Sequence, residues 1–436
     1  MKKNLLLVPF LLFLLESAGQ QPEIILKKGW NFGFLPAVAY DSDLGIYYGI
    51  IINPFDYGDG SVYPDYLQSV FLQVSGYSGG SSEHILEYVS YSLLPSTRFS
   101  TGIKYTGYKA YPFYGYNGNE SYYNVDWEND ESSAYRTRMF YRLARKNFRI
   151  LTDIQDTVGN TNYQWHLGFM ANYCRTGAVD IVRMNKRLPA SRQLPDTATL
   201  YDKYCEWGLL DDAERDGGIT GTLMAGLIYD SRDRLTCPGK GVFSEVNLLW
   251  MPPFLCEKNY SYLKFGLIHR QYITLVTRRL IFAYRFWLNV NLAGDQPFYT
   301  RQLIAGFQGN EGYGGYSTLR GVLMQRIVAE GFILGTAELR SRLVNFRFIN
   351  QNWYIGAVAF IDAGRIIKPV SLNLSNVPQA DYEIFFRPSD RSLHKSAGGG
   401  LKLAMNENFV LSAEFAAPFD RQDGVSGLYL GLGYQF

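Results

Sequence analysis

The sequence predicts an all-β fold, a sixteen-stranded antiparallel transmembrane β-barrel with an inward-folded outer loop. Three observations predict it. Apolar and polar side chains alternate in segments of about ten residues. The long connections between those segments all follow odd-numbered segments, and Tyr (34), Phe (28) and Gly (43) are abundant. Only alternate residues of a transmembrane barrel meet lipid, so such a chain keeps a modest overall hydropathy.

The last segment shows the alternation most clearly. One face carries five apolar or aromatic side chains, Leu428, Leu430, Leu432, Tyr434 and Phe436. We expect this face to contact lipid and the other, which is rich in glycine, to face the barrel interior. A strand of a soluble sandwich would also alternate, but it would seldom place its apolar set at the end of the chain, where termini fray in water.

Upstream segments follow the same pattern and carry charges on the second face. Arg279–Asn291, Arg136–Leu143 and Asn408–Phe415 each oppose an apolar face to a face with Arg or Glu. A charge is costly against hydrocarbon, so the charged faces are expected to point into the lumen. Counting such segments predicts sixteen strands, at 32–40, 44–54, 66–77, 82–94, 97–109, 135–151, 161–176, 217–230, 240–250, 259–273, 278–292, 329–344, 352–364, 395–405, 407–417 and 427–436.

The lengths of the connections predict the orientation. The long ones, 110–134, 177–216, 293–328 and 365–394, all follow odd-numbered strands, and those after even-numbered strands are short apart from 55–65. Outer-membrane barrels have short periplasmic turns and long outer loops, so the first strand is expected to start in the periplasm. The mixed charges of 177–216 indicate a solvated surface loop, with a partner-binding lid as the alternative.

The N-terminus predicts export. Met1-Lys2-Lys3 precedes an apolar run from Leu5 to Leu15, and small residues follow at Ser17-Ala18-Gly19. This order is typical of a cleaved signal peptide, here 1–20. The run is too short to span a bilayer as a helix, which needs about 20 residues. Residues 21–31 would then form a short periplasmic lead, and 32–436 a multi-pass barrel in the outer membrane of a Gram-negative envelope.

Composition and motifs argue against several classes of function. The net charge of +2 does not indicate nucleic-acid binding. No Cys-x-x-Cys pair occurs and the four His lie far from any Cys, so neither a metal site nor a cofactor is expected. The string 76–80 matches Gly-x-Ser-x-Gly, but a polar turn and another alternating segment follow it, whereas a nucleophile elbow needs a helix. We therefore do not expect an enzyme.

Two of the four cysteines are candidates for a disulfide. Cys174 and Cys205 both fall near the predicted outer rim, and an exported chain meets an oxidising compartment. Cys237 falls in a predicted periplasmic turn, too far from them to bond without large movements.

Several short strings in the second half of the chain resemble a family signature. They are Gly226-Leu-Ile-Tyr-Asp230-Ser-Arg232-Asp233, Pro238-Gly-Lys-Gly241, Leu319-Arg320-Gly321, Ala337-Glu338-Leu339-Arg340 and Phe360-Ile-Asp362-Ala-Gly364. Their joint order resembles the bacterial surface antigen superfamily of outer-membrane barrels, which includes BamA, TamA and the two-partner secretion transporters. The string Pro112–Asn119 also resembles a glycine-aromatic loop of that family. The first two strings place the motif residues Asp230, Arg232, Asp233, Pro238 and Gly241 in a periplasmic turn.

The resemblance implies a lumen lock around Arg320. Arg320 and Gly321 end a Gly-rich outer loop, while Glu338 and Asp362 fall on inward faces of the predicted twelfth and thirteenth strands. A planar guanidinium suits bidentate pairing with carboxylates. The family's loop arginine folds back into the lumen in this way. From the sequence alone, a solvated loop arginine is the alternative.

The resemblance also implies a function. It suggests a role in outer-membrane protein assembly or protein translocation, with outer-membrane lipid, other envelope proteins and unfolded outer-membrane clients as partners. BamA-like members carry N-terminal POTRA repeats, and because the predicted first strand starts near Phe32, a member lacking these repeats is expected. The five apolar residues of the last segment resemble the C-terminal assembly signal of such barrels. The alternatives are a small-solute channel and a structural anchor for a surface or periplasmic partner.

Overall fold

A computed structural model of the chain describes residues 24–436, apart from 42–44, 95–96, 187, 278, 305–311 and 388–392. The predicted signal peptide lies outside the described residues. The strands are β1 (Trp30–Asp41), β2 (Gly45–Asp56), β3 (Gln68–Tyr77), β4 (Ser82–Leu94), β5 (Thr97–Pro112), β6 (Arg142–Thr157), β7 (Tyr163–Gly177), β8 (Gly217–Asp230), β9 (Gly241–Met251), β10 (Tyr262–Val276), β11 (Leu280–Gly294), β12 (Gly331–Phe348), β13 (Gln351–Lys368), β14 (His394–Met405), β15 (Phe409–Pro418) and β16 (Gly427–Leu432). Three short helices, α2 (Ile181–Asn185), α3 (Leu200–Glu206) and α4 (Gln379–Phe385), lie in connections.

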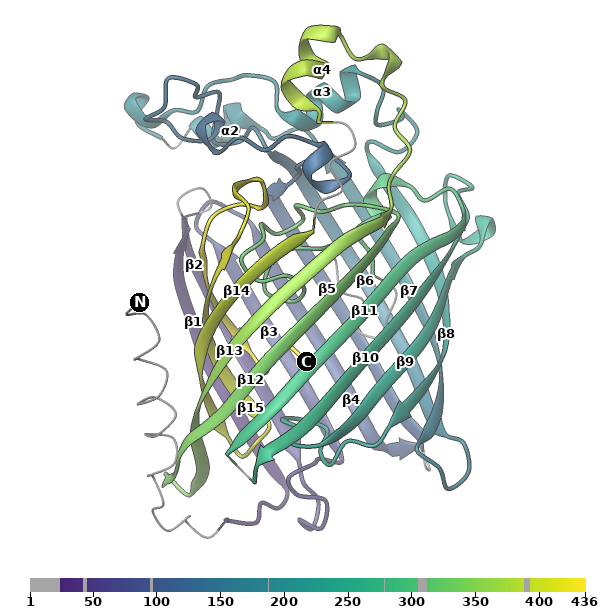
Figure 1. Cartoon of the computed structure of the whole chain (residues 1–436), viewed down its shortest axis with the longest axis vertical. Helices are drawn as coiled ribbons and strands as arrows, with labels where there is room; N and C mark the ends of the chain where they lie inside the picture. Colours follow the sequence, from purple (N-terminus) through teal and green to yellow (C-terminus); the bar gives the residue numbers. More distant parts are fainter. Residues whose placement is uncertain are drawn as a thin grey trace, which may run out of the picture.

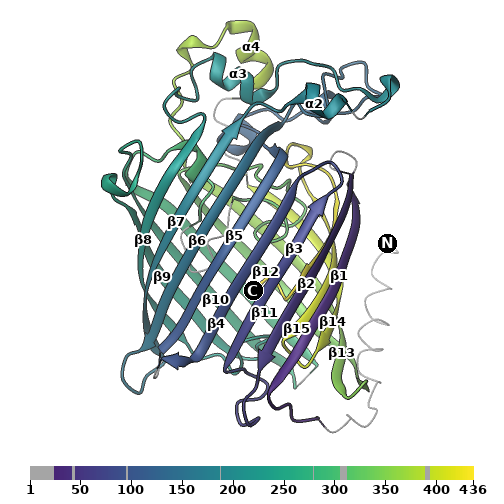
Figure 2. The same cartoon turned by 180° about the vertical axis from the view of Figure 1, so that it is seen from behind.

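The sixteen strands form one antiparallel sheet in chain order, which confirms the predicted fold class. The sheet curls into a tall barrel with tilted strands, as two opposite views show (Figures 1 and 2). Every described ladder joins strands that are neighbours in sequence, and the order runs from β1 to β16. Within the described residues, no ladder joins β16 to β1. The two ends of the sheet approach each other at a seam, where a Cβ on Gly33 of β1 would lie 2.3 Å from the Phe409 ring of β15.

The sheet is apolar outside and polar inside. Along β9, Glu245 and Asn247 are buried, whereas Val246, Leu248 and Trp250 between them are exposed. A soluble protein buries its apolar face, so this inverted alternation fits a wall whose outer face meets lipid. In the part of the chain that the structure describes, no helix is both long enough and apolar enough to span a membrane.

The wall is much higher on one side than at the seam. β12 and β13 have 18 residues each and β16 has 6. At about 3.3 Å per residue, six residues cover about 20 Å, which is less than the hydrocarbon thickness of about 30 Å. The last strand is therefore too short to span the apolar layer by itself.

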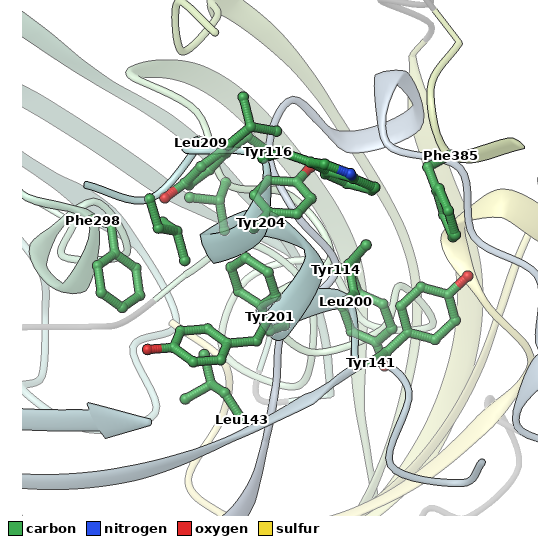
Figure 3. Close-up of a cluster of buried hydrophobic side chains, with 14 of the residues drawn as sticks. Tyr114, Tyr116, Tyr141, Leu143, Leu200, Tyr201, Tyr204, Leu209, Phe298 and Phe385 are labelled. Carbon is green, nitrogen blue, oxygen red and sulfur yellow. The ribbon is translucent and has the colours of Figure 1, made fainter. Parts of the chain in front are cut away.

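The long connections gather over one mouth of the barrel and form an outer cap, here residues 113–141, 194–210 and 370–386. The cap carries α3 and α4, and α2 lies beside it (Figures 1 and 2). Its interior is a cluster of buried aromatic side chains (Figure 3). Phe113 packs edge-on against Tyr204 with ring centroids 5.2 Å apart, and Trp127 packs in the same way against Phe385 at 5.3 Å. Aromatic packing thus holds together connections that are far apart in sequence.

This cap explains one error in the predicted strands. Arg136–Leu143 was expected to begin a strand at 135, but β6 begins at Arg142. The Arg136 guanidinium lies 4.3 Å from the Trp127 ring centroid and 5.1 Å from that of Phe140. Because these contacts draw the segment into the cap, its apolar alternation reflects aromatic packing there rather than a lipid-facing wall.

The inverted wall predicts the effect of a charge on its outer face. Changing Val246→Arg on β9 should destabilise the folded barrel by about 2–4 kcal/mol, because the guanidinium would face hydrocarbon. The matched control is Phe254→Arg, at an exposed site just beyond the end of β9. Urea unfolding in lipid vesicles measures both. Equal stabilities for the two variants would contradict a lipid-facing β9.

Candidate functional site

The described parts of the connection between β11 and β12, residues 295–304 and 312–330, fold back into the lumen and carry Arg320; we call them the lumen loop. The Arg320 side chain is fully buried. Its Nε and Nη2 donate to the two oxygens of Asp362 at 2.9 and 3.0 Å, and its backbone N–H donates to the same carboxylate at 3.1 Å. Its guanidinium carbon also lies 3.3 Å from the centre of the Phe360 ring. This is the bidentate geometry that the guanidinium fork favours.

Arg320 belongs to a balanced network of three cations and three carboxylates. Its Nη1 also lies 2.7 Å from Glu338 Oε1 and donates to Glu414 Oε2 at 2.9 Å. Arg340 Nε donates to Glu338 at 2.8 Å, and Lys402 Nζ donates to Glu414. The carboxylates come from β12, β13 and β15, so one loop side chain ties three strands together. Buried charges are stable only when paired, and here each charge has a partner.

The end of the chain turns into the same network. β16 ends at Leu432, and Gly433 has φ +79°, which a residue with a side chain rarely adopts. Arg340 Nη2 donates to the main-chain oxygen of Phe436 at 2.7 Å, and Arg285 lies over the Phe436 ring at 5.1 Å. The prediction that Tyr434 and Phe436 share a lipid-facing strand face with Leu428, Leu430 and Leu432 is therefore wrong, because the backbone bends inward after Leu432.

The tail 433–436 and the lumen loop bind each other directly. Gln435 Nε2 donates to the carbonyls of Tyr316 and Thr318 at 2.9 and 3.0 Å. The backbone N–H of Gly321 donates to the hydroxyl of Tyr429 on β16 at 2.8 Å. The last strand is therefore held from the lumen side by the loop as well as by its ladder with β15.

A second buried arginine connects the loop to the outer cap. Arg326 donates to the carbonyls of Gly118 and Ser121 at 2.8 Å each and to the carbonyl of Gln422 at 2.7 Å. The string Pro112–Asn119 supplies part of this site, since Asn117 N–H donates to the carbonyl of Val328 at 2.8 Å. The lumen loop is thus fixed to the wall through Arg320 and to the cap through Arg326.

The turn motif between β8 and β9 folds residues 231–240, which we call the strap. Arg232 donates from Nε and Nη2 to the two oxygens of Asp230 at 3.0 and 2.7 Å. Asp233 accepts the backbone N–H groups of Gly239 and Lys240 at 2.9 and 3.2 Å. Gly241 has φ +110°, and a Cβ there would lie 2.3 Å from the carbonyl oxygen of Ser231. Pro238 lies within the strap and lines a cavity beside Tyr354 and Tyr434.

The strap crosses the mouth opposite the outer cap and is fastened on the far side of the sheet. Arg234 Nη1 lies 3.0 Å from Glu407 Oε2 in the turn between β14 and β15, and the backbone N–H of Leu235 donates to Asp65 at 3.0 Å. Cys237 Sγ donates to the carbonyl of Glu407 at 3.1 Å. Arg342 on β12 also binds Glu407, at 2.7 and 2.5 Å. Strands that are distant in the sheet are thereby joined beneath the lumen.

Charge and hydrogen bonding keep Glu407 ionised. Burial by itself would raise the pKa of this carboxyl, but the hydrogen bonds from Arg342 and the charge of Arg234 outweigh burial and lower the pKa. The contribution of these ion pairs to stability is therefore complete at neutral pH and is lost as the pH falls below the ordinary Glu pKa of about 4.3.

The structure places the cysteines and Ser78 that the sequence analysis singled out as follows. Cys174 is buried in the cap cluster and Cys205 packs against it, but all four thiols are free, so the structure does not form the disulfide that we considered. Burial raises the pKa of the Cys205 thiol, which lowers its thiolate fraction. Ser78 lies in the β3–β4 turn, where its hydroxyl accepts the N–H of Ile46 at 3.0 Å, and a strand follows it.

The sequence pointed to only part of this site. Glu338 and Asp362 were expected beside Arg320, whereas Glu414 was recognised only as an inward-facing charge of Asn408–Phe415. Lys402, Arg326 and Glu407 were not singled out. An isolated charge on an inward strand position was the available signal for Glu414 and Lys402. Nothing in the spacing indicates that Arg234 on the strap meets Glu407 across the mouth.

The network predicts the consequence of removing Arg320. Arg320→Ala should destabilise the barrel by about 3–5 kcal/mol, because three buried carboxylates lose a shared partner. The stability of Arg320→Lys should lie between those of the native protein and Arg320→Ala, because lysine keeps the positive charge but lacks the planar guanidinium fork. Arg347→Ala, an exposed position on β12, is the matched control. Heat-modified gel migration and urea unfolding measure the effect, and native behaviour of Arg320→Ala would rule out the lock.

The strap predicts a local effect at Glu407. Glu407→Gln should speed hydrogen exchange of the amides of 232–240 without changing exchange in β6 and β7, because it breaks the ion pairs to Arg234 and Arg342. Lowering the pH of the native protein should have the same effect only when the pH falls below the lowered pKa of Glu407, which lies under the ordinary Glu value of about 4.3. Glu131→Gln, an exposed change in the outer cap, is the control. Unaltered strap exchange in Glu407→Gln would mean that the strap is held by other contacts.

Comparison with known proteins places the fold. The family description "Omp85 superfamily domain" matches residues 97–436. No curated protein sequence matches the chain. A structure of BamA from Haemophilus ducreyi lacking POTRA domains 1–3 is similar with a TM-score of 0.51 and 17% identity, over 92% of this chain and 69% of that one. CdiB from Escherichia coli gives a TM-score of 0.53 and 10% identity, over 94% and 62%.

The two neighbours share the fold of this chain. Their sequence identities of 17% and 10% are too low to indicate a shared function. The chain spans less than two thirds of the CdiB chain. The family match is stronger evidence, because it covers well over half of the sequence and includes the lumen loop, the strap and the last strand. It confirms the predicted resemblance: the protein belongs to the Omp85 superfamily.

Proposed function

We propose that this protein assists outer-membrane protein assembly or protein translocation, and that the seam between β1 and β16 is where a client strand pairs. The observation that carries the proposal is the form of the last strand. β16 covers only Leu411–Ala416 of β15 before the chain turns into the lumen. A short last strand leaves backbone groups at the edge of the sheet, and an edge strand is a template for pairing with another chain.

Side chains hold the seam at the strap end of the barrel. A Cβ placed on Gly33 of β1 would lie 2.8 Å from Cγ of Phe409 on β15. Phe409 forms an apolar cluster with Phe55 and Tyr57, and Leu35 and Leu432 pack against it. Apolar contacts separate at a lower cost than a continuous hydrogen-bonded ladder in lipid, where each unsatisfied backbone group costs several kcal/mol. This contact supports a seam that opens.

The contents of the lumen favour a route through the wall over a route through the pore. The described parts of the lumen loop lie inside the barrel on the side of the outer cap, and the strap crosses the opposite mouth. Between them lies a cavity of about 270 Å³, lined by Leu235 of the strap and Ile304 of the loop. A small-solute channel needs a continuous path, which these segments interrupt. A role as an anchor would leave the short last strand without a purpose.

The proposal includes location and partners. Residues 1–20 would direct export, the long connections would lie outside the cell, and the strap would face the periplasm. Clients would be unfolded outer-membrane chains, whose strands carry the same alternation of apolar and polar residues. Other envelope proteins would deliver them.

A reversible cross-link across the seam tests the proposal. Gly33→Cys with Phe409→Cys, in a chain whose four native cysteines are changed to Ala, places two thiols at disulfide distance. Proteoliposomes with the native protein should fold an added, urea-unfolded barrel client severalfold faster than empty liposomes. The oxidised double variant should match empty liposomes, and reduction should restore the rate.

The reduced form is the control for the substitutions themselves. A locked protein that works as fast as its reduced form would contradict the seam mechanism. Native proteoliposomes that are no faster than empty ones would contradict the assembly function as a whole.

A further inference from the structure

A basic cavity of about 420 Å³ lies on the outer rim, where β5, β6 and β7 meet α2. Five cations line it, namely Lys109 of β5, Arg145 and Lys146 of β6, Arg175 of β7 and Arg183 of α2. Asp180 is the only carboxylate among its lining residues, and its Oδ1 accepts the backbone N–H of Arg183 at 2.9 Å. The cavity therefore has a surplus of positive charge.

Two of these cations face each other in the sheet. Lys146 lies directly opposite Arg175 in the β6–β7 register, and both side chains are exposed. Like charges at such positions repel each other. Within the described residues, neither side chain forms an ion pair with a carboxylate. The nearby Glu83 is bound to Lys104 at 2.9 Å and to Tyr108 at 3.1 Å. An anion from outside the chain would relieve the repulsion.

The position of the cations on the wall identifies the kind of anion. On β6 the exposed face continues from Lys146 to Phe148 and Ile150, and on β7 it continues from Arg175 to Tyr173 and Phe169. The charges thus stand at the end of the apolar band that contacts lipid. A ligand that fits carries phosphate at one end and hydrocarbon chains at the other, and basic pockets at this depth bind lipid head groups.

We propose that this rim pocket binds the phosphate groups of a phosphorylated glycolipid in the outer leaflet, with its acyl chains lying along Phe148, Ile150 and Tyr173. The inference rests on the proposed orientation, with the long connections outside the cell. It does not depend on the client role. Lys146 and Arg175 would hold the phosphate from the wall, and Arg183 would approach it from α2.

The experiment compares matched pairs of charge removals in the full chain. The test variant is Lys146→Gln with Arg175→Gln. The control is Arg192→Gln with Arg421→Gln, two exposed cations of the outer loops away from the cavity. Heat-modified gel migration verifies folding, which the test changes should favour because they remove a repulsion. The probe is diphosphorylated lipid A in detergent, and native mass spectrometry gives the dissociation constant.

We expect the test variant to bind lipid A at least about tenfold more weakly than the native protein and the control. Dephosphorylated lipid A should bind the native protein as weakly as lipid A binds the test variant, and inorganic phosphate alone should bind more weakly still. Equal binding by the test and control variants would overturn the site. Equal binding of lipid A and inorganic phosphate would show an adventitious anion site rather than a lipid site.

Discussion

The ion network around Arg320 is the interaction on which the rest of the lumen depends. Arg320 reaches the wall only because its loop folds inward. The loop stays inside because Arg320 pairs with Asp362 and shares Glu338 with Arg340 and Glu414 with Lys402. Arg340 extends the network to the end of the chain through Phe436. One guanidinium therefore determines the position of the loop, the direction of the tail and the spacing of three strands.

The lumen loop, the tail and the strap divide the barrel into regions of different rigidity. The wall from β12 to β15 is braced from inside by charges and hydrogen bonds. The seam is different, since the contact between Gly33 and Phe409 is apolar and β16 is short. In a bilayer thicker than its last strand, the lipid must thin locally or leave polar groups poorly covered. Because the wall from β12 to β15 is braced and the adjacent seam is held weakly, we expect the barrel to move at the seam.

Sequence reasoning succeeded where the environment of a residue, lipid or lumen, depends only on its position along a strand. Alternation along a strand reports which face meets lipid, and it predicted the sixteen strands and the inward position of Asp362. It failed where a tertiary contact overrides the local pattern. Tyr434 and Phe436 continue an alternating pattern, yet Gly433 turns the backbone and Arg340 binds the end of the chain. Arg136 likewise starts an alternating run, but that run packs in the aromatic outer cap instead of forming a strand. The contact of Arg234 with Glu407 joins positions 173 residues apart, which no local period encodes.

The seam has a consequence for how the chain reaches its native state. Asn408 donates to Tyr57 across 351 residues of sequence, and Ile25 pairs with Asn352 across 327. Contacts of such separation form late, because the entropy of closing the loop is lost before they stabilise anything. The first strands must therefore wait with open edges until the last ones arrive. During that interval the edges of its first strands have unpaired backbone groups, as do the strands of the clients proposed for it.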